Sequence, residues 1–450
     1  MNTTDAYYKK MTESPVSKLV ITLGIPTTIS MLVTSVYNMV DTYFVGTLGE
    51  SQQAATGILF TLQAIIQAIS FMLGQGSGTM VSKALADKNT KEASEYVSTG
   101  FFTGALLGTI LTVVGLIFLS PFMTMLGSTK TILPYAMDYG MWVLISCPFM
   151  VCSFVLNNNL RYEGKAFYSM IGLVTGAVLN IFGDYLLIRV LDWGVFGAGC
   201  STAVAQIISF GILFCFHRKY AQGKISVKYI SKKSDVYFTI GKVGFPALLR
   251  QGLSSISSGL LNNLTKPFGD AAIAAMSVVN RFSGLVMCVG LGVGQGFQPV
   301  ASFNYQAGKY RRVKKALLFT MGCGFLMIIC FALPGMIFPE FIISLFQKEQ
   351  AVREIGAVAL RYASFGIVFL ALSVPINMLY QSIRKPAMSS FLSLLRSGLA
   401  FIPVLLLTSQ LWGLTGIQIS QPVADMLTGL ISIPFIIHFL KNTPDEQEGK

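Results

Sequence analysis

Three acidic residues lie deep inside apolar stretches of this 450-residue chain: Asp41, Asp184 and Asp425. An ionised carboxylate costs at least about 2.5 kcal/mol at the centre of a membrane-spanning helix, so each one needs a partner or a function. Asn180 precedes Asp184 by four residues, which places both side chains on one helix face. No Lys or Arg well inside the apolar stretches of the same half of the chain could neutralise Asp41 or Asp184. Two such carboxylates predict a site that shares a proton or holds a cation.

The second half of the chain carries the opposite set of charges. Arg250, Arg281 and Arg396 lie within apolar stretches that hold one acid, Asp425. Counted along straight helices, Arg396 and Asp425 each lie about 14 Å into a hydrocarbon core about 30 Å thick, from opposite sides. We therefore predict a structural ion pair between them. A second coupling or gating site is the alternative.

Three further residues are candidates for a cavity or a hinge. Pro26 lies in the stretch that leads to Asp41, where it removes one helix hydrogen bond and can bend the helix. An ordinary kink is an equally good interpretation. Gln63 and Gln67 are four residues apart in the next stretch, and such a pair more often joins two helices than binds a ligand.

The composition shows that these residues lie in a membrane protein. Hydrophobic residues make up 53% of the chain and charged residues 12%, against about 25% charged in soluble domains. The mean hydropathy is +0.63. The net charge of +13 comes from Lys and Arg in short loops between apolar stretches. It indicates contact with anionic lipid headgroups and not with nucleic acid.

Twelve apolar stretches are long enough to cross a bilayer. They cover residues 19–45, 54–81, 97–120, 135–160, 167–189, 196–216, 237–264, 271–301, 316–338, 354–381, 387–409 and 416–440. Most Lys and Arg lie in loops on one side, including segments 218–233 and 309–315, so both termini are predicted to be cytoplasmic. The polar segment 1–15 lacks the apolar core of a signal peptide, and the first stretch is therefore expected to be a mature span.

The two halves of the chain are an internal repeat. A shift of 220 residues aligns small, polar and proline residues over long stretches. Examples are Gly24 on Gly244, Pro26 on Pro246, Gly76 on Gly296, Asn157 on Asn377 and Ser169 on Ser389. The same shift places Leu261, Ala400 and Val404 opposite Asp41, Asn180 and Asp184, so the predicted cation site exists in the first half alone.

The repeat predicts the architecture. Each unit holds six spans, an even number, so both copies enter the membrane in the same direction and are related by an axis along its normal. We expect two six-helix lobes, at 1–216 and 237–450, joined by the basic linker 217–236. Rocking of these lobes around a central cleft favours a transporter over a membrane enzyme or a receptor.

These features resemble the multidrug and toxic compound extrusion (MATE) family of antiporters. The matching stretches are GIPTTISMLVTSVYNMVDTYFVGTLG at 24–49, LRYEGK at 160–165, GAVLNIFGDYLLI at 176–188, GVFGAGCSTA at 194–203 and GQGFQPVASFNYQAGKYRRVKKA at 294–316. The resemblance covers nearly the whole chain. It implies an all-α membrane protein of twelve transmembrane helices in two lobes.

The resemblance also implies which residues bind the coupling ion, H+ or Na+, with no other cofactor or metal. They are Asp41, Asn180, Asp184 and Thr202, as in the prokaryotic branch with a first-lobe cation site. The exported compounds would be lipophilic and often cationic small molecules. The expected setting is a monomer in the plasma membrane.

Other positions match the family in part. Asn157 matches a polar position of the first-lobe cavity, although a helix-end cap is an alternative for it. Pro26 matches a proline invoked in bending of the first span. Other family members place essential acids in the second lobe, where this chain has Arg250 and Asn377.

Two other functions stay open. A lipid-linked precursor flippase of the same superfamily would use a cationic cavity, and the arginines of the second half fit that idea. A membrane-embedded enzyme lacks support, because the spans hold no Ser/His/Asp set, His-rich metal motif or phosphate loop.

Overall fold

The computed structural model describes residues 3–346 and 349–444, and its regular elements in these ranges are all helical. Those of the first half are α1 (Thr3–Glu13), α2 (Val16–Gly46), α3 (Glu50–Ala86), α4 (Thr90–Ile117), α5 (Leu119–Met125), α6 (Leu133–Tyr162), α7 (Ala166–Asp184), the π-helix η1 (Tyr185–Val190) and α8 (Gly194–Tyr220).

The second half repeats this series of long helices with more interruptions. Its elements are η2 (Val227–Tyr229), α9 (Ser234–Thr265), η3 (Lys266–Phe268), α10 (Asp270–Gln306), α11 (Tyr310–Ile337), α12 (Pro339–Phe346), α13 (Gln350–Gly366), η4 (Ile367–Phe369), α14 (Leu370–Ser382), α15 (Pro386–Leu394), the π-helix η5 (Leu395–Ala400) and α16 (Phe401–Asn442).

The helices account for the twelve predicted crossings. Within the described residues, ten helical segments are long and apolar enough to cross a membrane. One of them, Pro386–Asn442, is 57 residues long and breaks at Gly413, where φ is 56° and the backbone is not helical. It therefore contains two of the predicted spans. The remaining span is α9, which is 32 residues long but carries Arg250 and several Ser and Asn residues. The chain is a multi-pass helical membrane protein.

The chain divides into two compact units. Unit 1 comprises Met1–Tyr8 and Ile29–Leu248, and unit 2 comprises Lys9–Thr28 and Leu249–Lys450. The helices α2 and α9 are therefore each shared, because each begins in one unit and ends in the other. The predicted lobes 1–216 and 237–450 and the linker 217–236 stay a prediction drawn from the repeat.

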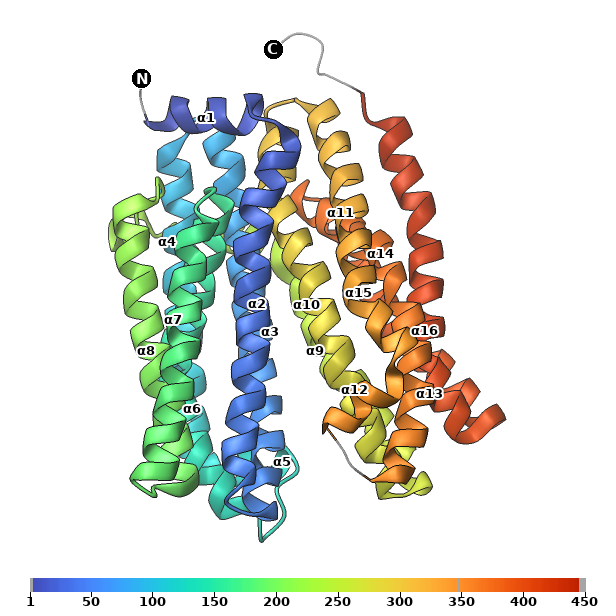
Figure 1. Ribbon diagram of the computed structural model, residues 1–450. Coiled ribbons are helices and arrows are strands. Elements are labelled where there is room, and N and C mark those ends of the chain that lie inside the picture. Colours follow the sequence, from blue (N-terminus) through green and yellow to red (C-terminus); the bar gives the residue numbers. More distant parts are fainter. Residues whose placement is uncertain (1–2, 347–348, 445–450) are drawn as a thin grey trace. The chain divides into compact units, whose positions relative to one another are not determined.

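In unit 1 the central helix is α6. It packs against α3, α4, α7 and α8, and α7 also packs along α8 (Figure 1). The core between these helices is aliphatic and includes Leu59, Ile66, Val143 and Leu156, all nearly inaccessible to solvent. Polar side chains on the same helices therefore sit at fixed positions within a rigid apolar packing.

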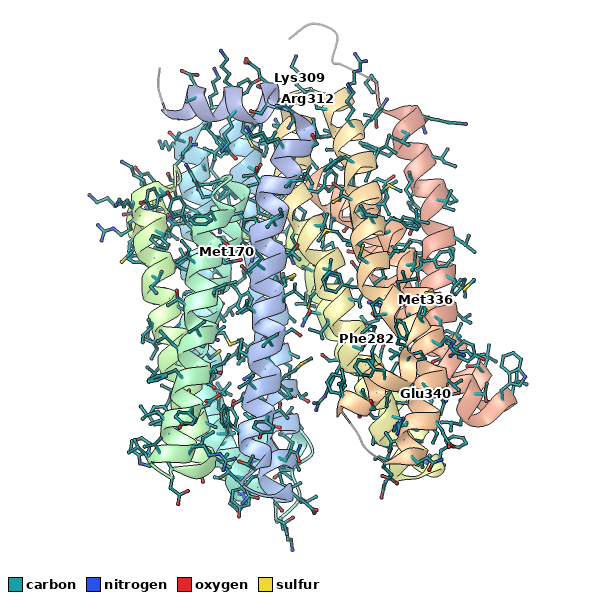
Figure 2. All side chains as sticks on the ribbon, viewed as in Figure 1. Met170, Phe282, Lys309, Arg312, Met336 and Glu340 are labelled. Atoms are coloured by element: carbon teal, nitrogen blue, oxygen red, sulfur yellow. The ribbon has the colours of Figure 1, made fainter. Side chains whose placement is uncertain are left out.

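In unit 2 the corresponding helix bundle is built around α10, which packs against α11, α13 and α14. Figure 2 shows Lys309 and Arg312 at one end of this bundle and Glu340 toward the other. Arg312 donates to the carbonyl oxygens of Met11 and Ser14 and to the Asn304 side chain. This member of the basic segment 309–315 thus holds the end of α1, where a cation complements unpaired helix carbonyls.

The repeat is visible in contacts as well as in sequence. Asn157 donates to the carbonyl oxygen of Ser169 at 3.3 Å, and Asn377 donates to the carbonyl oxygen of Ser389 at 2.9 Å. Both pairs join two helices at positions that the 220-residue shift relates. The structure thus places Asn157 inside α6, several residues before its end at Tyr162, where it ties α6 to α7.

Candidate cation site

The structure brings the four predicted cation-site residues together in unit 1. Asp41 lies on α2, Asn180 and Asp184 lie on the last turns of α7, and Thr202 lies on α8. All four side chains are buried, with exposures between 0% for Asp184 and 5% for Thr202. Three helices therefore converge on one polar cluster inside the membrane-spanning part of the unit.

Hydrogen bonds connect the cluster through Tyr139 on α6. Its hydroxyl donates to Asp41 Oδ2 at 2.9 Å and lies 3.2 Å from Thr202 Oγ1. On the other side, the Asn180 amide nitrogen donates to Thr202 Oγ1 at 3.1 Å and lies 3.5 Å from Asp184 Oδ1. The two acids are thus linked by neutral hydrogen-bonding groups.

The cluster holds two carboxyl groups, those of Asp41 and Asp184. Among the described residues, neither forms an ion pair with Lys or Arg. Three buried oxygens have no hydrogen-bond partner: Asp41 Oδ1, Asp184 Oδ2 and Asn180 Oδ1. Buried polar atoms are rarely left unpaired, and all three of these are acceptors. These three oxygens could therefore bind a proton or coordinate a hard cation such as Na+.

The end of α7 explains how the chain presents these groups. A side chain at Gly183 would overlap Ser201, so glycine lets α7 approach α8 closely. Ser201 uses this approach to donate to the Asn180 carbonyl oxygen at 3.0 Å. Directly after Asp184 the helix widens into the π-helix η1 (Tyr185–Val190). Such widened turns are common at functional sites because they redirect side chains.

A cavity with about 440 Å³ of empty space adjoins the site within unit 1. Asn180 and Thr202 line it together with Tyr37, which lies one turn before Asp41 on α2. Asn157 is not among its lining residues and bonds to Ser169 instead. The cavity thus shares two lining residues, Asn180 and Thr202, with the candidate cation site.

The other first-half candidates lie elsewhere. Pro26 lies inside the continuous helix α2, in the part that belongs to unit 2, whereas Asp41 belongs to unit 1. Gln63 is buried on α3 and Gln67 is half-buried on the same helix. Their predicted roles as cavity or hinge residues stay predictions.

The four charged candidates of the second half separate into three environments. Arg396 Nε lies 2.9 Å from Asp425 Oδ1, as the predicted ion pair requires. Arg250 donates to the Asn377 side-chain oxygen at 3.3 Å. Arg281 is exposed on α10. Whether the Arg396–Asp425 pair is structural or also serves coupling stays a prediction.

Sequence reasoning missed Tyr139 and Ser201. A tyrosine or serine inside an apolar stretch is common and carries no charge, so neither type marks a site by itself. The one available signal for Ser201 is its position next to Thr202. Tyr139 offers no such signal, because nothing in the sequence places α6 opposite Asp41.

Comparisons with known proteins agree with this fold. The MatE family model matches the chain twice, at residues 26–186 and 246–406. The multidrug export protein MepA of Staphylococcus aureus (strain NCTC 8325 / PS 47) is 26% identical over 441 residues, which cover 97% of this chain and 96% of that protein.

Solved structures give the same result for the fold. An outward-facing multidrug resistance MATE family transporter of the MOP superfamily has a TM-score of 0.90 at 22% identity, covering 96% of this chain and 98% of that one. A mutant form of the Vibrio cholerae MATE transporter VcmN has a TM-score of 0.89 at 20% identity, covering 95% and 97%.

The fold and the buried polar site define a multi-pass helical membrane protein with a duplicated six-helix unit. The two family matches begin at residues 26 and 246, the same 220-residue register that the sequence shows. The chain belongs to the MatE family. The resemblance to this family and the predicted twelve-helix, two-lobe fold are confirmed.

Proposed function

We propose that this protein is a secondary active exporter of lipophilic, often cationic small molecules, driven by inward movement of H+ or Na+. The observation that carries the proposal is the pair of buried carboxyl groups, Asp41 and Asp184, with unpartnered oxygens and only neutral hydrogen-bond partners in the described structure. The name of the relative MepA, a multidrug export protein, supports export of several compounds.

The residues of the site have separate roles in this proposal. Asp41 and Asp184 receive the ion, and one bound H+ or Na+ changes the charge of the pair from two negative charges to one. For Na+, the Asn180 side-chain oxygen and the Thr202 hydroxyl complete a set of hard oxygen ligands. Tyr139 orients Asp41 through its hydroxyl hydrogen bond.

Ion binding and substrate binding oppose each other. Loading of the ion weakens the attraction between the acids and a cationic compound in the adjacent cavity, and the compound then leaves to the outside. The unloaded protein returns by rocking of its two repeats and binds the next compound from the cytoplasmic side, where both termini lie. Exchange of ion and compound follows because the ion bound to the acids weakens binding of the compound in the adjacent cavity.

The test uses purified protein in liposomes under separately imposed H+ and Na+ gradients, with efflux of a fluorescent cationic dye as the readout. Asp41→Asn and Asp184→Asn should each abolish the ion-driven component. Asp138→Asn removes a negative charge from an exposed position on α6 and should leave efflux unchanged. Wild-type coupled rates for Asp184→Asn would refute the proposal.

A lipid-linked precursor flippase is the second candidate, because unit 2 places Arg250 and Arg396 within membrane-spanning helices. A headgroup-translocation assay on the same liposomes separates the two functions. Translocation of a lipid headgroup without dye efflux would favour the flippase.

A further inference from the structure

Unit 2 contains a cavity of a different chemical kind from the one beside the cation site. Its empty space, about 390 Å³ with open solvent included, lies between helices α9, α10, α14, α15, η5 and α16. Its polar lining consists of Arg250, Ser373, Asn377, Ser393, Arg396, Ser397 and Thr428. Its apolar lining includes Met287, Leu291, Val374, Met378 and Leu392. No acid lines this cavity, and two guanidinium groups do.

Arg396 has hydrogen-bond donors to spare at the cavity. Its Nε donates to Asp425 and one Nη donates to the Met287 sulfur at 3.1 Å, which is a weak acceptor. A guanidinium has five N–H groups, so three remain beyond these two bonds. The side chain is 17% exposed although it lies in a membrane-spanning helix. Its remaining N–H groups are therefore available to an acceptor in the cavity that Arg396 lines.

Asp425 does not cancel the positive charge of the lining. It is the one acid well inside the predicted spans of the second half, it is absent from the cavity lining, and its Oδ1 accepts from both Arg396 and Gln421. The cavity lining thus carries two positive charges, and the neighbouring acid supplies one negative charge.

Asn377 fixes the second guanidinium. Its amide nitrogen donates to the Ser389 carbonyl and to Ser393 Oγ, each at 2.9 Å, so its oxygen is directed to Arg250. Because Ser393 Oγ accepts this bond, its own hydrogen is available for an acceptor in the cavity. The network presents donors and no acidic acceptor.

Ser373 supplies an independent indication of a ligand. Its side chain is 5% exposed, it lines the cavity, and its hydroxyl oxygen has no hydrogen-bond partner. A buried hydroxyl without a partner is uncommon in a folded protein. A ligand oxygen in the cavity would accept its hydrogen bond together with those of the two arginines.

We propose that this cavity is a binding site for a lipophilic anion, namely a carboxylate or phosphate group attached to an apolar body. Arg250, Arg396 and Ser373 donate to the anionic oxygens, and the Met and Leu side chains accommodate the apolar part, for which flexible thioethers are well suited. The binding site itself is independent of the cation site.

The experiment measures binding of a dansyl-labelled alkyl carboxylate to the full-length protein in phosphatidylcholine nanodiscs. Its methyl ester is the uncharged control. Loss of a hydrogen-bonded charge partner is expected to weaken binding about tenfold to a hundredfold. We expect binding to weaken by this factor for the ester with the wild type, and for the carboxylate with Arg250→Gln. Ser373→Ala, a small change that preserves the charge network, should weaken carboxylate binding without changing thermal stability.

Arg361→Gln is the matched control, because Arg361 is an exposed arginine on α13 outside the cavity lining. It should bind the carboxylate as the wild type does. Equal affinities for the carboxylate and its ester, or unchanged binding in both Arg250→Gln and Ser373→Ala, would overturn the proposal.

A second arm identifies the source of the anion. Partial replacement of phosphatidylcholine by phosphatidylglycerol should weaken carboxylate binding in the wild type if a lipid phosphate occupies the cavity. Unchanged binding would assign the cavity to a free amphiphilic carboxylate, and either result supports an anion site. Asp184→Asn should keep carboxylate binding intact, so a failure of ion-coupled efflux would not be confused with a failure of this site.

Discussion

At the scale of single residues, the candidate cation site combines two carboxyl groups, which are costly to bury in a membrane, with neutral polar side chains, which cost little. Asp41 and Asp184 stand out in the sequence because a carboxylate is expensive in a membrane, and Asn180 stands out through its spacing from Asp184. Thr202 was identified only through the family resemblance. Tyr139 could not be found, because a tyrosine in an apolar helix costs little and its partner is determined by tertiary packing.

The hydrogen bond from Tyr139 to Asp41 leads to a prediction about stability. Tyr139→Phe leaves Asp41 Oδ2 without its donor, and the pair should show a coupling of about 1.5–3 kcal/mol in a double-mutant cycle with Asp41→Ala. The measurement is the free energy of unfolding of the purified protein in detergent. Tyr135→Phe, on the same helix one turn earlier, should be additive with Asp41→Ala. Additivity of Tyr139→Phe and Asp41→Ala would contradict the geometry described above.

At the scale of secondary-structure elements, the basic segment between the repeats is more ordered than a solvated linker. Its backbone is bonded to serine and threonine side chains of α4: Lys224 N–H donates to Ser94 Oγ at 3.0 Å, and Ser231 N–H donates to Thr99 Oγ1 at 3.0 Å. The buried Glu163, which follows α6, accepts from the backbone N–H groups of Gln222 and Gly223. Charge composition alone indicates an exposed loop, because it does not reveal where backbone donors find acceptors.

Glu163 makes the stability of the contact between the linker and the ends of α4 and α6 depend on pH. Burial raises the pKa of its carboxyl from 4.5 to about 7, although the N–H groups of Gln222 and Gly223 and the nearby Lys165 act in the opposite direction. The pKa is higher in the folded than in the unfolded chain, so this stabilisation is complete below pH 4.5 and is lost as pH rises through about 7. The loss amounts to roughly 3 kcal/mol at high pH.

Glu163→Gln should remove this pH dependence. The melting temperature of the variant is expected to rise relative to the wild type between pH 5 and pH 8, because glutamine never ionises. It keeps one acceptor oxygen for the two linker N–H groups that Glu163 accepts. Glu95→Gln on α4, close in sequence to Ser94, should instead follow the wild-type curve. Parallel curves for Glu163→Gln and wild type would show that Glu163 does not control the docking.

At the scale of the whole molecule, glycines at repeat-related positions let helices from the two halves of the sequence pack closely within each unit. The beginning of α9 lies against α3, where a Cβ atom on Gly76 would lie 3.2 Å from the Gly244 backbone nitrogen and would overlap the Ile240 carbonyl. The repeat-related contact is between α2 and α10, where a side chain on Gly296 would overlap the backbone of Gly24. The sequence shows that these glycines align. It does not show that they meet, since an alignment contains no information about packing partners.

These glycine contacts predict which small substitutions are harmful. Gly76→Ala should destabilise the protein by about 1–3 kcal/mol, because the added methyl group meets backbone atoms that cannot rotate away. Gly57→Ala, on the same helix with no atom within 4 Å of the added Cβ, should be neutral or should stabilise by up to about 1 kcal/mol. Thermal unfolding in detergent measures both variants. Equal effects of the two substitutions would mean that the α3–α9 approach is looser than described.

The sharing of α2 and α9 also bears on the ancestry of the molecule. If one gene encoded six helices before it was doubled, two copies of its product would have exchanged their opening segments to complete their packing, as in a domain-swapped dimer. Joining the two copies end to end in one chain then made this association intramolecular. Two co-expressed half-length products of the present gene would have to associate before either could finish folding.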